Sequence, residues 1–352
     1  MRWDELSLAG SAAERPAGNL PLLPRGAVTR TVDTPEFRGI TFHEVTARSA
    51  LNKVPEASRV PFRWTVNPYR GCSHACVYCF ARKTHEYLDL DAGHDFDSQI
   101  VVKTNVAEVL RRELARPSWR REHVAMGTNV DCYQRAEGRY RLMPGVLAAL
   151  VDAANPFSIL TKGTLVLRDL EVLVQAASVA DVSAAVSVGF VDDRIWRSVE
   201  PGTPSPLRRL EVARRLNDAG IPCGVLMAPV LPYLTDSPED LDRTVAAIAA
   251  SGATHVSPIV LHLRPGAREW WQAWLRRDRP DLLRRYAELY GDRRYAPRAY
   301  QDRITGMVRD LARRHGVGRS GRHRVGVVRT ASRSPDVEAG PPAARPTQLS
   351  LL

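Results

Sequence analysis

Between residues 63 and 263, short apolar segments alternate with segments of helical periodicity, and this alternation most constrains the fold. The apolar segments are Arg63–Val66, Val124–Gly127, Phe157–Leu160, Ala184–Val188, Cys223–Ala228 and His255–Leu261. Apolar strands joined by helices are typical of a buried parallel sheet. Six such units with right-handed connections predict an α/β protein with an incomplete (β/α)6 TIM-like barrel. Functional residues are then expected at the carboxyl ends of the strands.

Helical patterns fill the connections between these strands. They cover Pro144–Ala154, Leu165–Ala177, Pro206–Ala219 and Pro238–Ala250. The third of them has Ser205 as a suitable N-cap, Pro206 in the first turn and Gly220 at its end.

The remaining residues predict a chain of four parts. Residues 1–59 are read as an irregular N-terminal extension with one short strand near Gly39–Val45. The core barrel is assigned to residues 60–265, and a helical segment rich in Trp, Tyr and Arg to residues 266–315. Residues 316–352 are polar and rich in Arg, Ser, Gly and Pro, so we expect a disordered basic tail.

Three of the five cysteines lie within eight residues, in the order Cys72-x-x-x-Cys76-x-x-Cys79. They follow the first predicted strand directly, where the barrel places functional groups. Thiolate is the ligand that the irons of a [4Fe–4S] cluster prefer. Three thiolates hold three corners of such a cluster and leave the fourth iron open to a small molecule. The motif therefore predicts an iron–sulfur site.

A structural zinc site is the alternative interpretation of the same cysteines. Zinc needs four closed ligands, and its C-x-x-C pairs usually occur twice. The second pair is missing, although His74, His85 and Cys132 are candidates for a fourth ligand. A disulfide is disfavoured, because the number of cysteines is odd and no secretory segment precedes the motif.

The net charge of +11 makes nucleic acid a candidate partner, because a basic surface attracts phosphate polymers. Only four basic residues are lysines, however, so part of this charge reflects a codon preference for arginine. No apolar stretch approaches the roughly 18 residues of a membrane span, so no membrane association is expected. Without a signal peptide, and with an oxygen-sensitive cluster, the reducing cytoplasm is the expected location.

A second set of motifs resembles the spore photoproduct lyase-like branch of the radical S-adenosylmethionine (SAM) superfamily, in particular an actinobacterial subgroup. Glu-Pro-Gly-Thr-Pro begins at Glu200, Ala-Gly-Ile-Pro at Ala219, and Val-Leu-Met-Ala-Pro ends at Pro229. With the cysteine motif, the similarity covers residues 60–265. It implies a [4Fe–4S] cluster on Cys72, Cys76 and Cys79, reductive cleavage of SAM, and abstraction of hydrogen from a substrate by the deoxyadenosyl radical.

The resemblance also implies SAM contacts at the strand ends. Tyr78 matches an aromatic residue beside the adenine, and Lys162 matches a lysine that pairs with the SAM carboxylate. Ser187 matches a serine that binds SAM. A packed aromatic ring, a surface lysine and a small strand residue are the structural alternatives.

Three further positions follow from the same resemblance. Asn129 and Asp131 come after the second strand, where the superfamily places acceptors for the SAM amine. Ala228 lies where backbone groups meet SAM.

One departure concerns the cysteine that returns hydrogen to the product radical in the lyase. The equivalent position here is Gly127, and Cys132 lies five residues further along. We therefore hypothesise that Cys132 is the hydrogen donor, with an inert buried cysteine as the alternative. The missing cysteine therefore argues against the splitting of a thymine dimer, while the resemblance keeps DNA, as in lyase-like repair, as a candidate substrate.

Two partners are predicted in addition to nucleic acid. The resemblance implies an electron donor such as flavodoxin or ferredoxin. Gln348–Leu352 resembles the short peptides with which bacterial DNA enzymes dock to the sliding clamp, and chance similarity is the alternative.

The alternative function is that of a zinc-stapled nucleic-acid-binding protein without catalysis, which would have no need of Lys162 and Ser187.

Overall fold

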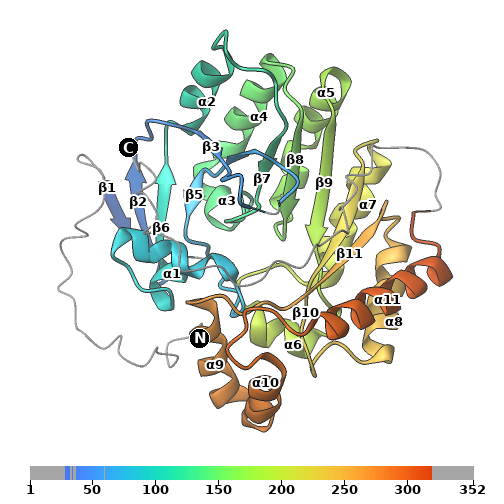
Figure 1. Ribbon diagram of the computed structural model, residues 1–352. Helices are drawn as coiled ribbons and strands as arrows, with labels where there is room; N and C mark the ends of the chain where they lie inside the picture. The colour runs from blue at the N-terminus through green and yellow to red at the C-terminus, as the bar shows by residue number, and fades with distance from the viewer. Residues whose placement is uncertain (1–27, 32–33, 35–36, 59, 319–352) are drawn as a thin grey trace.

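The computed structural model describes residues 28–31, 34, 37–58 and 60–318, and the chain is an α/β protein with two sheets (Figure 1). The predicted tail from residue 319 onwards and the docking peptide Gln348–Leu352 lie outside the described residues. In the described part of the chain, no helix combines the length and apolar character needed to cross a membrane.

The larger sheet contains the six predicted strands as neighbours in chain order. Its order is β11-β10-β9-β8-β7-β4-β3, with all pairs parallel except β3–β4. The sheet ends at β11 and β3 instead of closing, which confirms the incomplete barrel. Its strands are β3 (Leu51–Lys53), β4 (Trp64–Val66), β7 (Val124–Met126), β8 (Phe157–Thr161), β9 (Val182–Ser187), β10 (Cys223–Val230) and β11 (Val256–Val260).

Helices follow the strands as the periodicity predicts. Where a helix was expected over Leu165–Ala177, the chain begins as a 3₁₀ turn, η2 (Leu165–Asp169), and continues as α5 (Leu170–Val179). Ser205 caps α7 (Pro206–Asp218) by accepting a hydrogen bond from the Arg208 amide, as expected. The other connecting helices are α2 (Val106–Leu114), α3 (Ala136–Tyr140), α4 (Leu142–Asp152), α6 (Asp193–Val199) and α8 (Pro238–Ala250).

A second sheet lies beside the barrel, and the sequence predicted only one of its strands. Its order is β1-β2-β6-β5, and β2 and β6 pair in parallel although they are distant in the chain. The expected strand near Gly39–Val45 is β2 (Thr41–Val45); β1 is Val28–Thr31, β5 is Tyr69–Arg70 and β6 is Gln99–Lys103. Cys72 packs in the core of this sheet, whereas Cys76 packs in the barrel core. The cysteine loop therefore joins the two cores.

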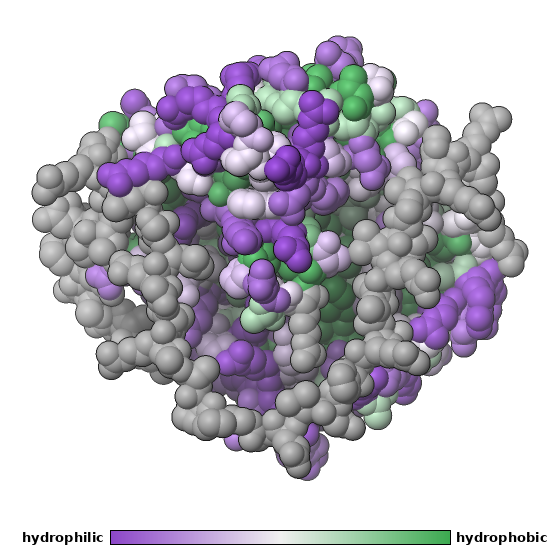
Figure 2. Space-filling model, turned by 45° about the horizontal axis from the view of Figure 1, so that its top comes forward, coloured by the Kyte–Doolittle hydropathy of each residue, from purple (hydrophilic) through white to green (hydrophobic). Residues whose placement is uncertain are grey.

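The C-terminal helices cover the lower side of the barrel in Figure 1. They are α9 (Ala267–Asp278), α10 (Leu283–Tyr290) and α11 (Arg298–His315), with a short 3₁₀ turn, η3 (Pro280–Leu282), before α10. Trp270, Trp271 and Trp274 of α9 are buried and pack in the core. Among the coloured residues of Figure 2, hydrophilic side chains predominate, with apolar ones near the centre and at the upper edge.

Candidate functional site

A cavity lies at the carboxyl ends of the barrel strands, where the fold predicts functional groups. It opens between the cysteine loop and the ends of β7 to β11. Nine of the ten residues proposed from the sequence line it: Cys72, Cys76, Tyr78, Cys79, Asn129, Asp131, Lys162, Ser187 and Ala228. Apolar residues such as Leu160, Leu226, Val260 and Leu261 complete the wall.

The three predicted cluster ligands line this cavity together, with Cys72 and Cys76 buried and Cys79 half-buried. Burial raises the pKa of the Cys72 and Cys76 thiols. Burial also raises the pKa of Cys79, although the Arg82 charge opposes this rise. Buried thiols become thiolates when metal cations replace their protons. The donor set of three soft sulfurs in an apolar pocket therefore fits an iron–sulfur cluster.

The backbone around the cysteine loop packs closely against it. Gly71 has φ +77°, and a Cβ there would lie 2.9 Å from the Gln99 carbonyl. The Cys72 amide donates to the Phe96 carbonyl over 2.9 Å, which ties the loop to helix α1 (His94–Ser98), directly before β6. Only glycine fits position 71, because this conformation and this approach leave no room for a side chain.

The Glu-Pro-Gly segment packs directly on the same loop. The Gly202 amide donates to the His74 carbonyl over 3.1 Å, and a Cβ on Gly202 would lie 2.3 Å from the Ser73 carbonyl oxygen. The Val77 amide donates to the Val199 carbonyl over 3.0 Å. The two motifs recognised in the sequence are therefore one structural unit.

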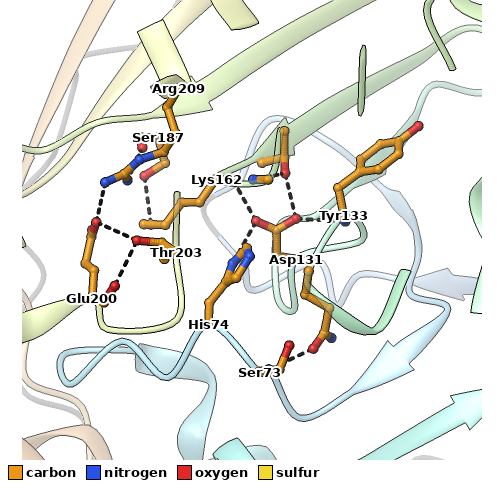
Figure 3. Close-up of polar contacts among 12 residues, drawn as sticks. Ser73, His74, Asp131, Tyr133, Lys162, Ser187, Glu200, Thr203 and Arg209 are labelled. Carbon is orange, nitrogen blue, oxygen red and sulfur yellow. Dashed lines mark hydrogen bonds and ion pairs between the residues drawn. The ribbon is translucent and has the colours of Figure 1, made fainter. Parts of the chain in front are cut away.

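Asp131 connects the ends of two strands with the cysteine loop (Figure 3). Its Oδ1 accepts from Thr161 Oγ1 at 2.7 Å and from the Tyr133 amide at 2.9 Å. Its Oδ2 accepts from the Lys162 amide at 2.6 Å and lies 3.3 Å from His74 Nδ1. Burial raises the pKa of Asp131, but His74 and these donors outweigh it, so the pKa lies below its ordinary value. The carboxylate thus positions the loops around the cavity.

Lys162, Ser187 and Ala228 form one hydrogen-bonded chain across three neighbouring strands. Lys162 Nζ donates to Ser187 Oγ at 2.9 Å, and Ser187 Oγ donates to the Ala228 carbonyl at 3.0 Å. Lys162 Nζ also lies 5.8 Å from the centroid of the Tyr78 ring. The ammonium therefore faces the cavity with a defined orientation.

A buried ion pair supports Tyr78 and Ser187 from behind. The Tyr78 hydroxyl donates to Glu200, whose Oε2 lies 2.5 Å from Arg209 Nη2. Arg209 Nη1 donates to the Ser187 carbonyl at 2.7 Å. Burial raises the pKa of Glu200, but Arg209, Lys162 and the Tyr78 hydroxyl outweigh it, so the pKa is lowered. The sequence analysis named Glu200 only as the start of the Glu-Pro-Gly motif, and it missed Arg209, one of many arginines in this chain.

Asn129 and Cys132 differ in where the fold places them. Asn129 lines the cavity, and no hydrogen bond of its side chain to another described residue occurs. Cys132 is 1% exposed and is absent from the cavity wall. Gly127 lines the cavity with φ +75°, and a Cβ there would lie 1.8 Å from the Leu160 carbonyl oxygen. A cysteine in place of Gly127 has no room in this backbone.

Of the three candidate fourth ligands of a zinc site, only His74 lines the cavity with the cysteines. His74 pairs with Asp131, Cys132 lies outside the cavity wall, and His85 Nε2 lies 2.8 Å from the Gln99 carbonyl oxygen. Among the described residues, no three or more His, Cys, Asp and Glu side chains gather around a single point that suits one metal ion.

Comparisons with known proteins place these features in context. An uncharacterized protein of Mycobacterium tuberculosis is 53% identical over 324 residues, which cover 92% of this chain and 95% of that protein. An uncharacterized protein of Methanocaldococcus jannaschii is 26% identical over 195 residues, covering 55% of this chain and 69% of that protein.

Among solved structures, spore photoproduct lyase complexed with dinucleoside spore photoproduct has a TM-score of 0.60 at 14% identity, covering 79% of this chain and 80% of that chain. This likeness is one of fold. Residues 66–245 match the model of the Radical SAM superfamily, which is half of the chain. The chain belongs to the radical SAM superfamily.

Proposed function

We propose that this protein is an enzyme that holds a [4Fe–4S] cluster on Cys72, Cys76 and Cys79, cleaves SAM reductively and abstracts hydrogen from a substrate. The observation that supports this most directly is the shared cavity, in which these thiols lie with the Lys162 and Ser187 side chains. A structural cysteine site has no use for a half-buried ammonium at the end of β8.

The residues around the cavity divide the binding of SAM among them. A cluster held by Cys72, Cys76 and Cys79 would supply the electron that breaks a carbon–sulfur bond of the sulfonium. Lys162 offers an ammonium to the SAM carboxylate, and its bond to Ser187 fixes where that ammonium points. Tyr78 presents its ring to the adenine, held by the hydroxyl bond to Glu200. The apolar wall keeps water away from the radical.

Anaerobic reconstitution tests this proposal. Wild-type protein is expected to be brown, to hold about four irons per chain and to form deoxyadenosine from SAM after reduction with dithionite. Cys76→Ala is expected to lose both iron and deoxyadenosine. The matched control is Cys223→Ala, because Cys223 is also buried but lies on β10 outside the cavity wall. Colourless wild-type protein with one zinc would contradict the proposal and support the zinc-stapled alternative.

We propose nucleic acid as the substrate class, supported by the net charge of +11. Because position 127 has no room for a cysteine, the reaction is expected to differ from that of the lyase. Deoxyadenosine formation measured with damaged DNA, undamaged DNA and RNA tests the substrate. If none of the three nucleic acids raises the formation of deoxyadenosine, the proposal that nucleic acid is the substrate is contradicted.

The partners and location follow as further proposals. Flavodoxin or ferredoxin in the cytoplasm would deliver the electron. The test replaces dithionite with each of these donors and measures the formation of deoxyadenosine. Gln348–Leu352 would dock to the sliding clamp. Full-length protein is expected to bind purified clamp and a chain without these five residues is not; equal binding by both would contradict the docking.

A further inference from the structure

Arg82 contacts the backbone of two of the three cysteines in the loop. It lies in η1 (Phe80–Leu88), a 3₁₀ helix that begins directly after Cys79. Its main-chain amide donates to the Cys79 carbonyl over 3.4 Å. Its guanidinium donates to the Cys76 carbonyl from Nη2 at 2.9 Å and from Nε at 3.3 Å. The side chain is fully buried, so this charge is permanently inside the protein.

The other donors of the guanidinium hold the segment that follows. Nη1 donates to the Gly93 carbonyl at 2.7 Å and to the Ala92 carbonyl at 3.3 Å. Nη2 lies 3.0 Å from each carboxylate oxygen of Asp97. Asp97 therefore balances the charge of Arg82, while the guanidinium itself contacts the cysteine loop.

Two aromatic rings isolate this ion pair from water. The guanidinium carbon lies 5.2 Å from the Phe96 ring centroid and 4.9 Å from the Trp270 ring centroid. Trp270 comes from α9, so the C-terminal helical segment covers the cation. In such a dry environment a charge acts on its neighbours much more strongly than it would in solvent.

We propose that Arg82 is a positioning residue that fixes the cysteine loop and that its charge raises the reduction potential of the cluster held there. This inference rests on the proposed function. A reduced cluster carries one more negative charge than the oxidised one, so a nearby cation stabilises it. The negative charge of Asp97 has the opposite effect and lowers the reduction potential. The Arg82 charge is the stronger influence, because the guanidinium contacts the Cys76 carbonyl directly.

The test is a redox titration of full-length, anaerobically reconstituted protein, with dithionite as reductant and the EPR signal of the reduced cluster as readout. The variants are Arg82→Gln, Arg82→Lys and Asp97→Asn. Arg82→Gln is expected to lower the potential and Asp97→Asn to raise it, whereas Arg82→Lys stays close to wild type. Arg111→Gln is the control and is expected to leave the potential unchanged, because Arg111 is exposed and pairs with Asp152.

The opposite signs separate an effect of charge from a loss of structure. Loosening of the loop alone would move both neutral variants in the same direction, which overturns the assignment. If Arg82→Gln fails to hold iron, Asp97→Asn decides, and an unchanged or lowered potential in that variant overturns the inference. Wild-type protein that never holds a cluster overturns the proposed function and this inference together. If the wild-type cluster can be titrated and Arg82→Gln and Asp97→Asn have the same reduction potential as wild type, this inference alone is overturned.

Discussion

The Lys162 ammonium reaches Ser187 on the next strand, with 2.9 Å between Nζ and Oγ. The same serine donates onwards to the Ala228 carbonyl on the strand beyond. A flexible side chain is thus held in one orientation before any ligand arrives, which reduces the entropy lost on binding.

Lys162→Met is expected to weaken SAM binding by about 10- to 100-fold, because a charged hydrogen bond contributes roughly 1.5–3 kcal/mol. Anaerobic equilibrium dialysis with labelled SAM measures this, and the iron content should not change. Lys83→Met is the control, since Lys83 is exposed and lies 4.0 Å from Glu86. Equal affinities for both variants would show that Lys162 does not contact SAM.

Glu200→Gln is expected to lower the free energy of unfolding by about 3–5 kcal/mol, because it leaves Arg209 buried without its counterion. The control Glu211→Gln removes an exposed pair with Arg214, which solvent screens, and should lower the free energy of unfolding much less. Denaturant titration gives both values. A small effect at Glu200 would mean that water reaches Arg209.

The same ion pair predicts a pH dependence. The pKa of Glu200 lies below its ordinary value of 4.5, so the ionised carboxylate stabilises the folded state above that value. This contribution is lost as the pH falls below 4.5 and through the lowered pKa. Unfolding free energies measured from neutral to acidic pH should fall more steeply for wild type than for Glu200→Gln. Parallel curves would assign the acid sensitivity to other groups.

Gly127→Ala is expected to destabilise the fold by more than about 3 kcal/mol, because a Cβ would overlap the Leu160 carbonyl oxygen at 1.8 Å. Gly306→Ala is the control. Gly306 lies inside α11, and a Cβ added there would have no neighbour within 4 Å, so this substitution should stabilise the fold by about 0.5–1 kcal/mol. Thermal or denaturant unfolding compares them. A neutral Gly127→Ala would show that β7 and β8 can separate locally.

Cys132→Ala is expected to leave the iron content, the deoxyadenosine yield and the product distribution unchanged, because Cys132 is buried away from the cavity wall. Product analysis by mass spectrometry checks this against Cys223→Ala. A changed product distribution for Cys132→Ala alone would support the hypothesis that Cys132 donates hydrogen.

The barrel was predictable because its strands are continuous apolar segments with clear helical patterns between them. Phe157–Leu160 and Pro238–Ala250 appear in the structure as β8 and α8 with nearly the same ends. The second sheet was not predictable in the same way. Its strand β6 pairs with β2, and no local periodicity reports a pairing between such distant segments. The pairing of strands that are distant in the chain depends on tertiary packing.

The candidate site was partly predictable for a similar reason. Lys162 and Ser187 end adjacent strands, so a parallel sheet brings them together. Arg82 and Arg209 gave no signal, because arginine is the common cation of this chain and burial cannot be seen in the residue type. His74 was considered only as a zinc ligand, whereas the structure pairs it with Asp131.

The contact between Gly202 and the carbonyls of Ser73 and His74 leaves no space for even a methyl group. Grafting the cysteine loop onto a foreign barrel would therefore fail unless the turn at residues 199–203 is transplanted with it. During divergence the two segments are expected to change in concert, so a chimera that exchanges one without the other should accumulate as insoluble protein.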